Sequence, residues 1–304
     1  MKNIQIILHC LPREIDDTDR ILDQLHKSSF YLSDNDKITL DVTLNLSDKL
    51  TNWNESLLPK EYFVDRFRLM EKKSDWTYHN IFDVNESDKC LGINDKRRNS
   101  LREHNPSHFM YLDTDVYFSQ FNLSYIFRAL EQIKNEYHIV SSQLLRLWDD
   151  SWNVISNERF IPMGTESKIW KTFDPFGIDK ECFDNLDYVG VKKISEIKFG
   201  GGWFNIFSSN LLKFIDIPDS FGSYGLDDTY IMECSNLMKQ RGYDISQYVI
   251  NNMVVMENRK YRFHPYEKFL KDATIDESHR EEKRNSANAK YVLEINKFIR
   301  KLEE

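Results

Sequence analysis

A short apolar run that ends in two acids constrains this chain more than any other feature. The apolar residues 109–112 are followed at once by Asp113, Thr114 and Asp115. Continuous apolar runs of this length are typical of strands that are buried on both faces. In open α/β sheets, ligands bind beyond the carboxyl ends of such strands. The run therefore predicts a central strand whose carboxyl end opens into a site.

The rest of the chain alternates between strand and helix patterns. Residues 4–8 form an apolar run, residues 18–27 carry one apolar stripe, and residues 38–46 alternate as a strand with one exposed face does. Further elements are expected at 95–104, around 126–133, from 138, from Asp227 to just before Gly242, and over 276–304. Strands alternating with helices predict an α/β fold. Residues 50–95 and 143–198 show no clear period, and we expect loops and short elements over 143–198.

Composition narrows the class of protein. The chain has 304 residues, with 41 basic and 49 acidic side chains and a net charge of −8, which disfavours broad attraction to nucleic acid or anionic lipid. Its four cysteines lie far apart, so neither a disulfide framework nor a thiolate zinc site is indicated. No stretch reaches the roughly 18–20 apolar residues that cross a bilayer. We expect a globular cytoplasmic protein without a transmembrane segment.

The acids at 113 and 115 suit a hard cation. On an extended chain, residues two apart point to the same side, so Asp113 and Asp115 would share one face. Mg²⁺ or Mn²⁺ held by one or two carboxylates keeps positions open for substrate phosphates. An ordinary strand-to-turn junction is the alternative interpretation.

A run of three glycines, Gly200, Gly201 and Gly202, precedes Trp203 in a chain that has only ten glycines. Glycine lets a sugar or phosphate approach the backbone closely, and the indole offers an aromatic face for a ring. The alternative is a sharp turn with Trp203 in the core.

Two further candidates lie towards the C-terminus. Asp227 and Asp228 open a predicted helix, where acids cap the helix and favour its dipole, or where one of them acts as a general base. His264 is either a loop histidine with a hydrogen-bond partner or a further ligand to Mn²⁺.

Together these motifs resemble the GT-A glycosyltransferases, above all the β-1,4-galactosyltransferase, polypeptide N-acetylgalactosaminyltransferase and chondroitin-synthase-like branch. That branch shows, in order, a basic helix, a strand ending in Asp-x-Asp, a Gly-Gly segment, a block ending in Glu-Asp, and a histidine. The corresponding residues here are 96–99, 109–115, 199–202, 214–218 with 224–228, and His264. The match covers about residues 90–265.

The resemblance implies a Rossmann-like GT-A domain over residues 1–265, with a mixed, mostly parallel central sheet flanked by helices. Its donor half would span about 1–142 and its acceptor half about 143–265, followed by a C-terminal helical extension over 266–304. The activity implied is transfer of a sugar from a nucleotide sugar, first of all a UDP-sugar, to an acceptor hydroxyl.

The resemblance also implies roles for single residues on the donor side. Asp115 would bind Mn²⁺ or Mg²⁺ directly, Asp113 would contact the ribose or a metal-bound water, and His264 would be the third protein ligand. Arg97 or Arg98 would hold the donor diphosphate. Gly201, Gly202 and Trp203 would complete the donor site.

On the acceptor side, Asp228 would be the base of an inverting displacement, and Asp227 would orient the acceptor. The usual Glu-Asp pair is Asp227-Asp228 here, and Ser223-Tyr224-Gly225-Leu226 replaces the usual Trp-Gly-Trp-Gly. Both departures concern the acceptor, so its identity does not carry over. A glycan, another hydroxyl-bearing molecule or a modified nucleic-acid base stays open, the last disfavoured by the acidic net charge.

Two other functions compete with transfer. A nucleotidyltransferase that makes nucleotide sugars would need a Gly-rich basic loop after the first strand, and residues 9–13 contain no glycine. A non-catalytic carbohydrate-binding protein would use the aromatic residues Trp148, Trp152 and Trp203.

Overall fold

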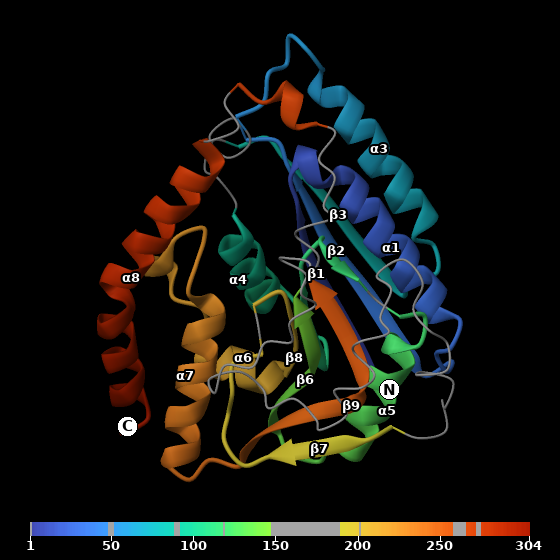
Figure 1. Ribbon diagram of the computed structural model, residues 1–304. Helices are drawn as coiled ribbons and strands as arrows, with labels where there is room; N and C mark the ends of the chain where they lie inside the picture. Colours follow the sequence, from blue (N-terminus) through green and yellow to red (C-terminus); the bar gives the residue numbers. More distant parts are fainter. Residues whose placement is uncertain are drawn as a thin grey trace.

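The computed structural model describes residues 2–47, 52–87, 92–117, 119–146, 189–200, 202–257, 266–271 and 275–304. The strands are β1 (Lys2–Cys10), β2 (Asp36–Asn45), β3 (His79–Asn85), β4 (His108–Leu112), β5 (Val116–Tyr117), β6 (Tyr137–Arg146), β7 (Val191–Ile194), β8 (Phe204–Ser208) and β9 (Ile245–Glu257). The α-helices are α1 (Ile15–Ser29), α3 (Lys60–Lys73), α4 (Ile93–Glu103), α5 (Asn122–Gln132), α6 (Ser209–Ile215), α7 (Asp227–Gln240) and α8 (Ile275–Lys301). Figure 1 shows these helices around a central sheet.

The described strands form one sheet in the order β3-β2-β1-β4-β8-β6-β9-β5, with β7 paired to β9. Strand β1 pairs in parallel with β2 on one side and with β4 on the other, whereas β8 runs antiparallel to β4 and β6. The strand order therefore reverses beside β1, and such switch points are where α/β sheets bind ligands. The expected α/β fold with a mixed sheet flanked by helices is confirmed.

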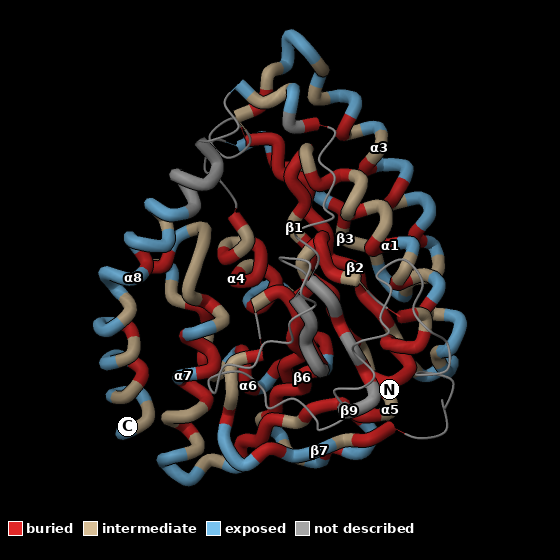
Figure 2. Tube along the Cα trace, in the orientation of Figure 1, coloured by how far each residue is buried: buried red, intermediate tan, exposed pale blue. Residues whose placement is uncertain are grey.

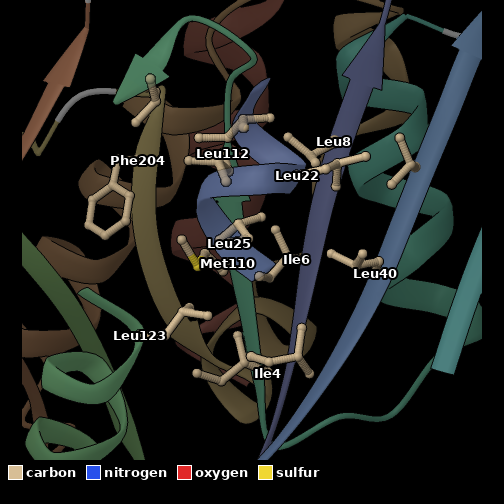
Figure 3. Packing of buried hydrophobic residues seen from close by; sticks show 14 of the residues in the cluster. Ile4, Ile6, Leu8, Leu22, Leu25, Leu40, Met110, Leu112, Leu123 and Phe204 are labelled. Carbon is tan, nitrogen blue, oxygen red and sulfur yellow. The ribbon is translucent and has the colours of Figure 1, made fainter. Parts of the chain in front are cut away.

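Each face of the sheet has its own hydrophobic core. Ile4, Ile6 and Leu8 of β1 pack in the same cluster as residues of α1, α3 and α5. Figure 3 shows Ile6 and Leu8 close to Leu22 and Leu25 of α1. On the opposite face, Ile7 of β1 joins residues of α4, α6, α7 and α8. Side chains alternate across a strand, so the continuous apolar run of β1 supplies both layers.

Strand β2 differs from the sequence-based expectation. Its alternating pattern predicts one exposed face, but Ile38 to Asn45 are all buried. Lys96 and Ser100 of α4 reach the carboxylate of Asp41 on the polar face of β2. The expectation was wrong because a helix covers the polar face with charged and hydroxyl groups.

Helix α3 and strand β3 lie within residues 50–95, where the sequence shows no clear period. Helix α3 buries Phe63, Phe67 and Met70, which are spaced along one helical face, and β3 pairs in parallel with β2. The exposed outer faces of α3 and α8 border the molecule in Figure 2, with buried chain between them. Most of 143–198, including Trp148 and Trp152, lies outside the described residues.

The predicted terminal helix is confirmed as α8. Ala287 and Phe298 are buried in the cluster that includes Ile231 of α7, and Ser220 donates to Glu294 at 2.7 Å. Within the described part of the chain, no helix is both long and apolar enough to span a membrane.

Candidate functional site

The chain turns directly after β4. The backbone N–H of Asp113 donates to the carbonyl of Trp203 at 3.0 Å, and residues 114 and 115 form a turn that leads into β5. The Arg20 guanidinium of α1 holds this turn, donating to the carbonyls of Thr114 at 2.7 Å and Val116 at 3.0 Å. A side chain distant in sequence therefore fixes the shape of the acidic motif.

Within this turn the two acids have unlike surroundings. The Asp113 side chain is 42% exposed, whereas Asp115 is only 6% exposed. Our assumption that residues 113–115 stay extended is wrong, because the chain turns at Thr114 and Asp115. The described residues contain no group of three or more His, Cys, Asp or Glu side chains arranged to hold a metal.

Arg97 of α4 brings the acidic motifs together. Its Nη1 lies 2.6 Å from Oδ2 of Asp227, and its Nη2 lies 3.3 Å from Oδ1 of Asp113. Nη2 also donates to the carbonyl of Gly202 at 2.9 Å, and the guanidinium carbon lies 4.2 Å from the ring centre of Tyr111. Burial alone would lower the pKa of Arg97, but the carboxylates of Asp227 and Asp113 raise it above its ordinary value.

Asp227 and Asp228 begin α7, as predicted. The residue before them, Leu226, has φ 63° and ψ 0°, a left-handed conformation that is uncommon outside glycine and asparagine. Such backbone is retained where the surrounding structure fixes it, often at functional sites. It sets the direction in which the first turn of α7 presents its acids.

The Asp228 carboxyl differs from that of Asp227. Desolvation and, after it, the negative charge of Asp227 raise the pKa of Asp228 to about 6, although hydrogen bonding to Thr229 and the charge of Arg97 oppose the rise. Asp227 is buried against Arg97, whereas Asp228 is partly exposed. A carboxyl that gains a proton near neutral pH is suited to general base catalysis.

Gly202 lies against Asp228. A Cβ atom at position 202 would stand 2.3 Å from Oδ2 of Asp228. The close neighbour of Gly202 in this structure is therefore a carboxylate of the chain itself, and the approach of a sugar or phosphate to the glycines stays a prediction.

Trp203 and Arg98 are both buried. Trp203 is 3% exposed and lies in the cluster that includes Leu112, which agrees with the core alternative. Arg98 donates to the carbonyls of Ile217, Pro218 and Gly222. The guanidinium groups of Arg97 and Arg98 are thus both engaged by protein oxygens, and their role as diphosphate ligands stays a prediction.

Gly201 and His264 lie outside the described residues. The chain is described again from Tyr266, whose hydroxyl accepts from Nη1 of Arg66 at 2.7 Å and lies 3.1 Å from the hydroxyl of Tyr62. Tyr266 is therefore held on α3.

Two features near the candidate site were not predicted from the sequence, the contacts of Asn94 and a polar hollow beside α4. Asn94 of α4 contacts the loop before α7, through its backbone N–H to the carbonyl of Ser223 at 3.1 Å and its side chain to the carbonyl of Gly225 at 3.0 Å. A polar hollow of about 270 Å³ borders α4, β2 and β3, and Thr43, Asp83, Asn85 and Asn99 are among its lining residues. Polar positions near the carboxyl ends of 38–46 and 79–85 were the available signal.

The sequence matches no protein-family profile and no curated protein sequence. Several solved structures are similar in fold at low identity. A segment of Staphylococcus aureus TarS in complex with UDP-GlcNAc is 14% identical, with a TM-score of 0.46 over 87% of this chain and 60% of that one. The mannosyltransferase PcManGT from Pyrobaculum calidifontis, in complex with GDP-Man and Mn²⁺, is 12% identical, with a TM-score of 0.49 over 86% of this chain and 58% of that one. At these identities the likeness concerns the fold alone.

Proposed function

We propose that this chain is a glycosyltransferase that moves a sugar from a nucleotide sugar, with a UDP-sugar as the first candidate, to an acceptor hydroxyl. One observation carries the proposal. Acidic motifs from the end of β4 and the start of α7 meet around Arg97 at the switch point of the sheet, beside a glycine that leaves Asp228 room. The order of these motifs is the one expected from GT-A glycosyltransferases.

The donor would lie across the carboxyl ends of β1, β2 and β4. In this proposal the nucleobase of the nucleotide sugar occupies the polar hollow beside Thr43 and Asn85, and the diphosphate points towards Asp113. A nucleobase presents hydrogen-bond donors and hydrogen-bond acceptors at its edges, and carboxylate, amide and hydroxyl groups can pair with both.

The carboxylate ligands available at the end of β4 suit a divalent cation. Asp113 is a partly exposed carboxylate and Asp115 a buried one, and Mg²⁺ or Mn²⁺ is held by one or two such groups together with substrate phosphates. Asp113 and Asp115 would hold it, with His264 as the third protein ligand. When bound, such an ion supplies positive charge that offsets the charge developing on the departing diphosphate.

In the proposed reaction, Asp228 is the general base for the acceptor hydroxyl. Its ionised carboxylate takes the proton of the acceptor hydroxyl while that oxygen bonds to the anomeric carbon. The bond from this carbon to the diphosphate oxygen breaks on the opposite side, so the configuration inverts. The product is a glycoside, and the nucleoside diphosphate leaves.

The carbohydrate-binding alternative loses one of its supports. Trp203 is buried in the core, so its indole face is not open to a sugar ring in this structure.

The proposal is tested by nucleotide release. Wild type would be incubated with UDP-, GDP- and CMP-sugars, with and without Mn²⁺, and release of free nucleotide would be measured beside an Asp228→Asn variant. We expect release from one donor class, by transfer to water in the absence of an acceptor, and a loss of at least about 100-fold in Asp228→Asn.

The matched control is Asp75→Asn, which neutralises an exposed acid in the turn after α3. It should behave as wild type. Release from no donor would contradict glycosyl transfer, and equal rates for wild type and Asp228→Asn would contradict the role of Asp228 as base.

A further inference from the structure

Three consecutive cations of α4 point to three different parts of the molecule. Lys96 pairs with Asp41 of β2, Arg98 binds carbonyls of the loop before α7, and Arg97 contacts the candidate site. Successive residues of a helix are about 100° apart around its axis, so one turn can serve all three directions. Of these three, Arg97 contacts acids of both motifs.

The Arg97 guanidinium makes contacts on both of its terminal nitrogens. Nη1 faces Asp227 at 2.6 Å, and Nη2 faces Asp113 at 3.3 Å and the carbonyl of Gly202 at 2.9 Å. Its side chain is 4% exposed and lies over the ring of Tyr111. A cation this buried, with oxygen partners on both nitrogens, presents little surface to a donor phosphate.

We propose that Arg97 is a positioning residue that fixes Asp113 of the donor side against Asp227 of the acceptor side and leaves Asp228 as the carboxyl that takes the proton. The inference rests on the proposed function and changes the role of Arg97 within it. Arg97 acts through the two acids and touches neither the sugar nor the diphosphate.

Arginine is needed here for its shape. Its planar fork places two nitrogens in fixed directions, so one side chain can hold two separate carboxylates at a set spacing. A lysine ammonium is a point charge at the end of a flexible stem, and it would keep the charge without fixing this spacing. The stacking on Tyr111 further restricts the plane of the guanidinium.

The contact of Arg97 with Asp227 also affects the charges that act on Asp228 at the start of α7. The groups that act on the Asp228 carboxyl include the neighbouring Asp227, which raises its pKa, and Arg97 and the Thr229 N–H, which lower it. On α8, burial raises the pKa of Tyr291, and the charges of Glu233, Cys234 and Asp228 raise it further. Loss of the Arg97 charge should therefore move the Asp228 titration to higher pH.

The test compares Arg97→Lys and Arg97→Met with wild type, using initial rates against donor concentration from pH 5 to 8. Arg102→Lys is the matched control, because Arg102 lies on the same helix and pairs with Asp216 and Asp219 at the surface. We expect kcat to fall at least tenfold in Arg97→Lys while the donor KM changes less than threefold. The acid limb of kcat should shift to higher pH in Arg97→Met, and Arg102→Lys should match wild type.

Arg97→Met leaves Asp227 buried without its partner, so this variant can fail to fold. The double variant Arg97→Met with Asp227→Asn removes both charges and should recover the native melting transition while kcat stays low. A tenfold rise in donor KM with kcat unchanged in Arg97→Lys would overturn the inference and return Arg97 to phosphate binding. No turnover of any donor by wild type would instead refute the proposed function itself.

Discussion

Asp227 and Asp228 are neighbours in sequence, yet their side chains have unlike surroundings in the structure. Asp227 is buried against the Arg97 guanidinium, whereas burial and then the neighbouring Asp227 charge raise the pKa of Asp228. A buried carboxyl whose pKa is raised beside a second carboxylate is typical of sites that transfer protons. The contact between Arg97 and Asp227 contributes to this difference, and the local sequence around 227–228 does not reveal it.

Replacing Asp228 by asparagine should reduce activity and increase stability. A folded-state pKa above the ordinary value of 3.8 means that ionisation of Asp228 opposes folding. Its destabilising effect is therefore absent at low pH and complete above the folded-state pKa. We expect Asp228→Asn to raise the free energy of unfolding at pH 7 by about 1 kcal/mol, after allowance for solvent screening. Urea denaturation at pH 7 and pH 4 measures this gain, which should vanish at the lower pH.

Gly202 offers a second test at the scale of one residue. An added methyl group would meet Oδ2, Cγ and Cβ of Asp228, so the Asp228 side chain would have to leave its present rotamer, at a cost to folding of about 1 kcal/mol. A displacement of about 1 Å costs catalysis on the order of 100-fold. We expect Gly202→Ala to melt within a few degrees of wild type and to lose at least tenfold in kcat.

Gly242→Ala is the matched control for that variant. Gly242 ends α7 with φ +87° and has no atom within 4 Å of an added Cβ, so alanine there is strained without crowding a neighbour. It should lower stability by about 1 kcal/mol and leave activity per folded molecule unchanged. If Gly202→Ala kept full activity, the close packing of Gly202 on Asp228 would have no role in the reaction.

At the scale of elements, a buried histidine pair joins the first residues of β4 and β6. Nε2 of His108 lies 3.0 Å from Nε2 of His138, and Nδ1 of His138 lies 2.7 Å from the carbonyl of Asn135. Because a carbonyl only accepts, Nδ1 of His138 donates, and with both rings neutral Nε2 of His108 donates to Nε2 of His138. Burial, together with the charges of His138 and Lys2, lowers the pKa of His108 to about 3.

This pair should make the fold sensitive to acid. Histidines that stay neutral in the folded state but gain protons in the unfolded state give full stability above the unfolded pKa of 6.5, and stability falls as pH drops below it. We expect a loss on the order of 2 kcal/mol between pH 7 and pH 5. In His108→Gln, which keeps a hydrogen-bonding side chain, the loss should be smaller. Equal acid sensitivity in both proteins would contradict this account.

Elements with strong local patterns were predictable from sequence. Within each of β1, β4, α1 and α8, the spacing of apolar residues is enough to predict the element and its buried side chains. Helix α3 was missed although Phe63 and Phe67 carry a helical spacing, because the aromatic segment around it obscures the period.

Features that depend on distant partners were not predictable. The burial of β2 on both faces depends on Lys96, and the turn at Asp113 to Asp115 depends on Arg20 of α1. The sequence presents the residues of the candidate site as separate motifs. Their meeting around Arg97 could not be read from spacing, since Arg97 and Asp227 lie 130 residues apart.

At the scale of the whole molecule, one sheet connects the parts of the proposed site. The end of β4 lies between β1, which leads to the polar hollow beside β2, and β8, whose preceding residue pairs with Asp113. Helix α7 packs on the face that carries α4, and its first turn reaches the same edge. The acidic motifs at the end of β4 and at the start of α7 are thus positioned by a shared framework.

Thermal stabilisation by nucleotides tests the central claim, a donor site at the end of β4, most directly. Any ligand that binds the folded state alone raises stability by about 2.7 kcal/mol at 100 times its Kd, so no acceptor is needed. UDP, GDP and CMP would be added with and without Mn²⁺ to wild type and to Asp115→Ala. We predict a metal-dependent rise in Tm with one nucleotide in wild type and none in Asp115→Ala. A Tm unchanged by every nucleotide, with and without Mn²⁺, would contradict the account.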